Sequence, residues 1–253
     1  MESTLFEPMT VGQIFRTTFA LYRRHSWHFL GVVAVVYIPL ALLPATTDLL
    51  ELAGTGAHLV VVARMLIMIA APAICTGALT RSIVELHRGH PVSVCRAYGS
   101  LGSQALALAV AGILVGIGVL AGLLLFVLPG IVIAIYCAVT VPCVVMENLG
   151  PVAAMDRSRT LVRHDMAKVF WLGLILLVAS LAIGYPVGRV VYLSVAVLLG
   201  SGTPLTRFVS SLATGLAALW FWPAFVIPQI LLYFHLRSHE NEGLLPEDMR
   251  IRS

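Results

Sequence analysis

Six long runs with almost no charged residue constrain this chain more than any other feature. They are 17 to 27 residues long, and Arg64 is the one charge within them. About 20 apolar residues cross a bilayer as a helix, and a helix satisfies its own backbone hydrogen bonds in lipid. We therefore expect six transmembrane helices, at residues 29–47, 59–80, 105–128, 130–146, 169–188 and 208–234.

The composition supports a membrane domain. Hydrophobic residues make up 59% of the 253 residues and charged residues 11%. In a soluble domain about 45–50% of the residues are apolar and about 25% are charged. A chain with this composition must therefore be surrounded largely by lipid. The sequence predicts one integral membrane domain, residues 1–253, with an all-α fold: a polytopic transmembrane helical bundle of six spans, with short amphipathic cytoplasmic helices.

Arginine and lysine are concentrated in alternate connections. Thirteen of the 16 basic residues fall in four segments, which are 1–28, 81–104, 147–168 and 235–253. Cytoplasmic loops of membrane proteins carry the excess of basic residues. The N and C termini are therefore both predicted to be cytoplasmic.

The apolar segment 190–199 is too short to span a bilayer by itself. A seventh span there would move the C-terminal arginines to the outer side. We expect a re-entrant helix, an interfacial helix on the outer face, or a continuation of the fifth span past a bend at Pro186.

A weak internal repeat divides the chain into three units, 8–80, 90–146 and 150–235. Each unit has a short arginine-bearing segment followed by a helical hairpin, and in the second and third this segment begins at Pro91 and Pro151. Proline suits the first turn of a helix. All three units start on the same side, so they would be parallel repeats.

The first of these short helices has its own apolar pattern. Val11, Ile14, Phe15, Thr18 and Tyr22 recur at helical spacing. Such a helix lies in the headgroup plane or packs on its own bundle, and the sequence leaves both alternatives open.

Two glycine pairs mark the third span as a packing helix. Gly112 and Gly116 form one pair, and Gly118 and Gly122 the other. Small residues four apart let helices approach closely. The pairs are offset by two residues, or about 200° around a helix. The third span should thus be a central helix with a close neighbour on each side.

Arg64 and Gln229 are the candidate intramembrane polar site. An ionisable group within a span is by default a functional hypothesis. Arg64, however, lies near the outer end of its span, where its side chain could reach the headgroups. Gln229 is the strongly polar residue of the sixth span.

No catalytic, cofactor-binding or metal site is predicted. The nucleotide-binding and hydrolase motifs are absent. His235 and His239 are four residues apart, with Glu240 beside them, but a zinc site usually has three or four protein ligands. Nucleic-acid binding is not expected either, because no soluble domain carries a basic face.

Several short stretches, together covering most of the chain, share the pattern of a known family. They are Phe15-Arg16, 19–24, 128–131, 141–147, Gly150-Pro151, 156–161 and 232–237. They resemble the glycerophosphoryl diester phosphodiesterase membrane-domain family, six-span bacterial and archaeal proteins of unassigned function. The resemblance implies a bacterial or archaeal cytoplasmic membrane. The family is named after members with a soluble phosphodiesterase barrel; this chain lacks that domain, so the activity is not implied.

Two functional hypotheses remain from the sequence. The first is a non-enzymatic membrane scaffold or accessory subunit that interacts with membrane lipids and with other membrane proteins or further copies of itself. The alternative is a small transporter or channel with a site near Arg64 and Gln229. A lipid-modifying enzyme is a weaker third hypothesis, because no acid–base or metal cluster is visible.

Overall fold

The computed structural model describes residues 10–52, 57–89, 93–200 and 203–243. Within these ranges the protein is helical and has no strand. The helices are α1 (Val11–Leu52), α2 (Ala57–His87), α3 (Val94–Gly99), α4 (Gln104–Leu125), α5 (Val127–Tyr136), α6 (Thr140–Glu147), α7 (Pro151–Val162), α8 (Met166–Leu199) and α9 (Pro204–Gly243).

Six segments of these helices are long and apolar enough to cross a membrane, as the sequence predicts. They are Val11–Leu43, Val61–His87, Gln104–Leu125, Val127–Glu147, Met166–Leu199 and Leu219–Glu240. The expected all-α, polytopic fold is thereby confirmed.

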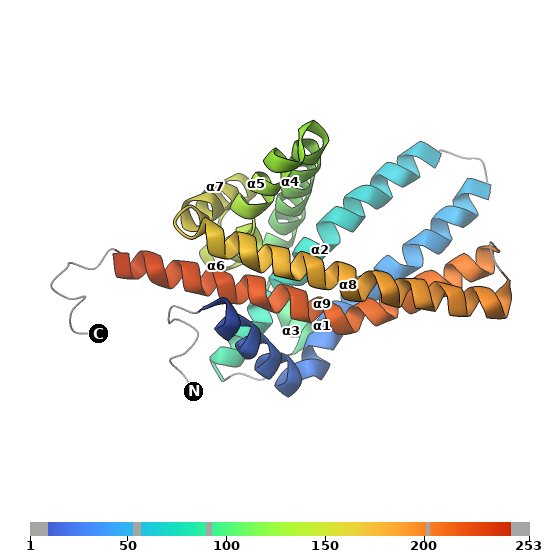
Figure 1. Ribbon diagram of the computed structural model, residues 1–253, viewed down its shortest axis with the longest axis horizontal. Coiled ribbons are helices and arrows are strands. Elements are labelled where there is room, and N and C mark those ends of the chain that lie inside the picture. The colour runs from blue at the N-terminus through green and yellow to red at the C-terminus, as the bar shows by residue number, and fades with distance from the viewer. Residues whose placement is uncertain (1–9, 53–56, 90–92, 201–202, 244–253) are drawn as a thin grey trace.

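The two ends of the bundle differ in chemistry. The start of α8 and the end of α9 lie together at one end (Figure 1), which carries Arg157, Lys168 and Arg237 and is called the basic end here. The paired helices α1 and α2, α4 and α5, and α8 and α9 point in diverging directions (Figure 1), and their far ends form the opposite side of the molecule. We call this the loop end.

The N-terminal part of α1 packs on the bundle. At His25 the backbone leaves the helical region, with φ −129° and ψ 27°, so α1 consists of two helices joined at a kink; the first, dark blue in Figure 1, is steeply inclined to the second. Ile14 on the first part is 2% exposed. The Tyr22 hydroxyl donates a hydrogen bond to the Trp220 carbonyl of α9 at 2.8 Å. The structure thus shows this helix packed on its own bundle, and a position in the headgroup plane stays a prediction.

The two other short helices lie between hairpins. Helix α7 begins at Pro151, the position expected, and follows Asn148, whose left-handed φ of 52° ends α6. Helix α3 begins at Val94; Pro91, its expected start, lies outside the described residues. The parallel-repeat organisation itself stays a prediction.

The fourth span is not one continuous helix, in contrast to the expected 130–146. Helix α5 ends at Tyr136 and α6 begins at Thr140. Pro142 has no N–H to donate to the preceding turn, and Ser158 of α7 is hydrogen-bonded to the backbone at the break. Its hydroxyl donates to the Tyr136 carbonyl at 2.6 Å and accepts from the Val139 N–H at 3.3 Å. One buried side chain thus satisfies a backbone donor and an acceptor.

Replacing Ser158 with alanine should therefore destabilise the protein by about 1.5 kcal/mol, because it leaves buried backbone groups without their partner. Ser158 is fully buried, so water is not at hand to replace it. Thermal unfolding in lipid discs measures the effect. Ser194→Ala, at an exposed serine that bonds only its own helix, is the matched control; an equal loss in the two variants would contradict this account.

The segment 190–199 continues the fifth span. Helix α8 runs without interruption through Pro186 to Leu199, a length of 34 residues. At 1.5 Å per residue it is about 51 Å long, well beyond the roughly 30 Å hydrocarbon core of a bilayer. Helix α9, with 40 residues, is longer still and runs beside α8 (Figure 1).

The core is concentrated toward the basic end. Phe29, Leu79, Leu108, Val144 and Tyr233 come from five different helices, and each is 0% exposed. Toward the loop end the helices diverge (Figure 1), and apolar side chains there are exposed. At the tip of the α4–α5 hairpin the exposed fraction is 64–79% for Leu124, Leu125, Phe126, Val127 and Leu128. The bundle is closed at one end and splayed at the other.

Candidate functional site

An arginine joins three helices at the basic end. Arg157 of α7 donates through Nε to Glu147 Oε2 of α6 at 2.8 Å, and through Nη1 and Nη2 to the two carboxylate oxygens of Glu240 in α9 at 2.7 and 2.6 Å. Hydrogen bonding to Glu240, and then to Glu147, raises the pKa of the Arg157 guanidinium. The group stays charged at every physiological pH.

Two further side chains extend this network along α9. The Tyr233 hydroxyl donates to Glu147 Oε1 at 3.0 Å, and Arg237 Nη1 donates to the Tyr233 oxygen at 3.1 Å. A bidentate arginine–carboxylate pair combines energy with fixed geometry. The network therefore acts as a clamp that holds α6 and α7 against α9.

A second polar cluster lies where α8 begins. Lys168 Nζ is 3.1 Å from Asp165 Oδ1 and 3.2 Å from His235 Nε2. The His235 and His239 rings meet edge to face, with centroids 4.7 Å apart. One possible ligand atom from each of Asp165, His235 and His239 lies within 4.8 Å of the others.

This cluster borders a cavity of about 640 Å³. Arg163, His164, Asp165, His239 and Glu240 are among its lining residues, so cations and carboxylates both face it. The sequence shows the histidine pair by its spacing. It does not show that Asp165, 70 residues earlier, completes a group of three.

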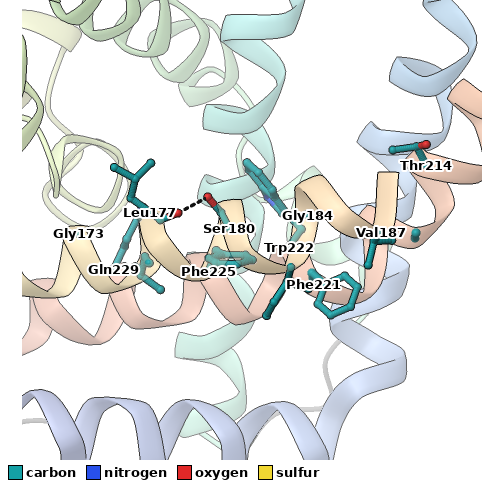
Figure 2. A pocket seen from close by; sticks show the side chains of 13 residues that line it. Gly173, Leu177, Ser180, Gly184, Val187, Thr214, Phe221, Trp222, Phe225 and Gln229 are labelled. Atoms are coloured by element: carbon teal, nitrogen blue, oxygen red, sulfur yellow. Dashed lines mark hydrogen bonds between the residues drawn. The ribbon is translucent and has the colours of Figure 1, made fainter. Parts of the chain in front are cut away.

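An apolar groove of about 390 Å³ lies between α8 and α9 (Figure 2). The indole Nε1 of Trp222 is buried there and has no hydrogen-bond partner among the described residues; its ring lies 4.9 Å from that of Tyr37 in α1. The Ser180 hydroxyl donates within α8, to the Leu177 carbonyl at 2.9 Å. Small, aliphatic and aromatic residues form most of the lining, among them Gly173, Leu177, Gly184, Trp222, Phe225 and Gln229.

The two residues of the predicted polar site do not share this groove. Gln229 lines it, whereas Arg64, half-buried on α2, does not. The groove therefore does not form a site that contains both residues. Of the two, Gln229 is the candidate for contact with a ligand in the groove. Its amide is a polar group in a mainly apolar lining.

The four glycines of α4 face two neighbours. A Cβ added at Gly112 would lie 2.7 Å from Ala73 Cβ of α2, and one at Gly116 would lie 2.5 Å from Ile69 Cγ2 of the same helix. The other two face α5: a Cβ added at Gly118 would lie 3.6 Å from Ile133 Cγ2, and one at Gly122 would lie 2.8 Å from the Gly130 backbone.

Helix α4 is nevertheless not the central helix that the glycine pattern predicts. Inside its most apolar stretch 17% of the residues are buried, against 61% for the Leu219–Glu240 span of α9. Close neighbours on two sides leave the rest of α4 exposed. The centre of the bundle is α9, which contacts α1, α2, α6, α7 and α8.

Comparison with family models, curated proteins and solved structures gives no match to this chain. The six apolar helices show an integral membrane protein. Any finer statement of function depends on the clamp, the polar cluster, the groove and the splayed loop end.

Proposed function

We propose that this protein is a non-enzymatic membrane scaffold or accessory subunit that holds lipid and docks another membrane protein at its loop end. The splayed loop end carries the proposal. Buried apolar side chains are concentrated toward the basic end, and those at the tip of the α4–α5 hairpin are exposed. Helices that associate in lipid need close packing surfaces, and the diverging hairpins leave such surfaces without a partner among the residues that the structure describes.

The basic end, by contrast, has the character of a fixed base. The clamp around Arg157 ties α6, α7 and α9 together with satisfied hydrogen bonds. We infer that this end faces the cytoplasm, because 13 of the 16 basic residues lie in the segments assigned to that side. The resemblance noted in the sequence makes a bacterial or archaeal cytoplasmic membrane the proposed location.

The α8–α9 groove is the proposed lipid site of this scaffold. Its lining suits an acyl chain, since Leu177 and Phe225 supply apolar contacts and Gly173 and Gly184 leave room for them. The Gln229 amide and the Trp222 indole N–H are donors that a lipid ester or headgroup oxygen could accept from.

A transporter is the second candidate. The break between α5 and α6 places non-helical backbone inside a span, as occurs where backbone lines a cavity or is buried in protein. At this break the Ser158 hydroxyl already bonds to the backbone. These hydrogen bonds favour a structural role for the break between α5 and α6, so transport is kept as the alternative.

The test is native purification into lipid discs from the membranes of the source cells, with mass spectrometry of what is retained. We expect a stoichiometric protein partner together with bound lipid. Leu177→Trp should fill the groove and reduce the lipid retained by about half or more, which corresponds to a loss of at least about 0.4 kcal/mol in binding free energy. Leu181→Trp, at a leucine of the same helix that is similarly exposed but lies outside the groove, should retain as much lipid as the wild type.

A homogeneous oligomer of this chain alone, retaining only lipid or a small molecule, would sink the accessory-subunit proposal. Flux of the retained molecule across liposomes would then test the transporter. Equal lipid retention in the Leu177 and Leu181 variants would remove the groove as the lipid site.

A further inference from the structure

We propose that Asp165, His235 and His239 bind a divalent first-row transition metal ion, with Zn²⁺ as the reference case, at the basic end. This goes beyond the scaffold function and does not depend on it. Two imidazoles and one carboxylate form a ligand set that suits zinc and its neighbours. Zinc sites with three protein ligands hold water in the fourth position.

The positions of the ligand atoms are close to those of such a site. All three lie within 4.8 Å of one another, whereas ligand atoms about 2.0–2.2 Å from a tetrahedral zinc lie about 3.4 Å apart. Side-chain rotations that move the ligand atoms by about an ångström would close this difference. Because His235 and His239 are four residues apart on α9, they share one face of that helix.

A positive charge already lies beside two of the three ligand residues. Lys168 Nζ lies 3.1 Å from Asp165 Oδ1 and 3.2 Å from His235 Nε2. A lysine ammonium can only donate, so beside the charged lysine His235 Nε2 presents its lone pair, and such a lone pair can also bind a metal ion. Two of the three ligand residues therefore already face a cation, and Lys168 and a metal ion compete for them.

The surroundings give a metal ion a way in. His239 is exposed, Asp165 is half-buried and His235 is 1% exposed, so the site is open on one side and closed on the other. The open side is the cavity lined by Arg163, His164 and Glu240. A bound ion would join the start of α8 to the end of α9 and add to the clamp beside it.

The test uses the full chain in lipid discs, purified through a tag without histidine and stripped with a chelator. Zinc affinity is measured by competition with a chromophoric chelator, and stoichiometry by metal analysis. We expect one zinc per chain. His239→Ala should weaken binding at least about tenfold, and Lys168→Met should tighten it about tenfold, because a half-exposed competing charge is removed. His164→Ala, a histidine of the same cavity outside the cluster, is the matched control and should bind as the wild type does.

The opposite responses of two neighbouring residues keep the proposal testable. Misfolding lowers affinity in any variant, whereas only a competing cation predicts tighter binding on removal of Lys168. Zinc should also raise the unfolding temperature of the wild type and not of His239→Ala, since a ligand stabilises the state it binds. The proposal is overturned by substoichiometric binding, by His164→Ala weakening it as much as His239→Ala, or by Lys168→Met failing to tighten it.

Discussion

Replacing Gly122 with alanine is expected to destabilise the protein by about 3 kcal/mol, near the upper end of the usual cost of overpacking a core. The added Cβ would lie 2.8 Å from the Cα and N atoms of Gly130. These are backbone atoms of α5, which cannot rotate away as a side chain can. Conversely, a Cβ at Gly130 would lie 2.7 Å from the Leu123 backbone nitrogen, so α4 and α5 must separate in either variant.

Gly118→Ala is the matched control on the same helix. Its Cβ would lie 3.6 Å from Ile133 Cγ2, an ordinary contact, and alanine is a better helix former than glycine by about 1 kcal/mol. We expect this variant to be as stable as the wild type or slightly more so, in thermal or denaturant unfolding in lipid discs. Similar stabilities for the two alanine variants would show that α4 and α5 are not in close contact at Gly122.

Replacing Arg157 with methionine should cost about 2.5 kcal/mol. Removing one partner of a buried ion pair costs about 3–5 kcal/mol, and the partial exposure of Arg157 (28%) and Glu240 (37%) reduces this. Glu147 and Glu240 would then face each other without the cation between them. Unfolding in discs, followed with a probe on α9, measures the effect.

Arg159→Met supplies the comparison for Arg157→Met. Arg159 is exposed on the same helix and contacts the Tyr136 ring at 5.4 Å, a cation–π contact worth about 0.5–1 kcal/mol. A double variant that also replaces Glu240 with glutamine should recover part of the loss, since one of the two uncompensated carboxylates is gone. The clamp is refuted if the Arg157 and Arg159 variants lose equal stability and the double variant recovers none.

The spans could be predicted from the sequence because lipid imposes a length and a composition on every crossing segment. The break in the fourth span could not. Pro186, Pro223 and Pro228 lie inside helices that continue through them, whereas the helix before Pro142 ends at Tyr136. The difference is the Ser158 hydroxyl on the backbone at the break, and a contact between residues so far apart in sequence has no local signal.

The candidate sites, too, could be predicted from the sequence only in part. The spacing of His235 and His239 is visible in the sequence, as is the offset of the glycine pairs on α4. Asp165 and Lys168 reach the histidines only because α8 and α9 run side by side. The glycine pattern likewise indicates close neighbours but not how much of the remaining surface is covered, and so it led to α4 instead of α9 as the central helix.

The burial of α9 has a consequence for how the protein is made. Helix α1 packs along α9 more extensively than any other pair of helices does, and α9 is the last of the described helices to leave the ribosome. The five earlier spans must therefore enter the membrane before the helix that forms their shared core exists. During that interval the insertion machinery or a chaperone has to keep α1 from wrong partners, and a chain shortened before Leu219 would present the cell with an unfinished bundle for degradation.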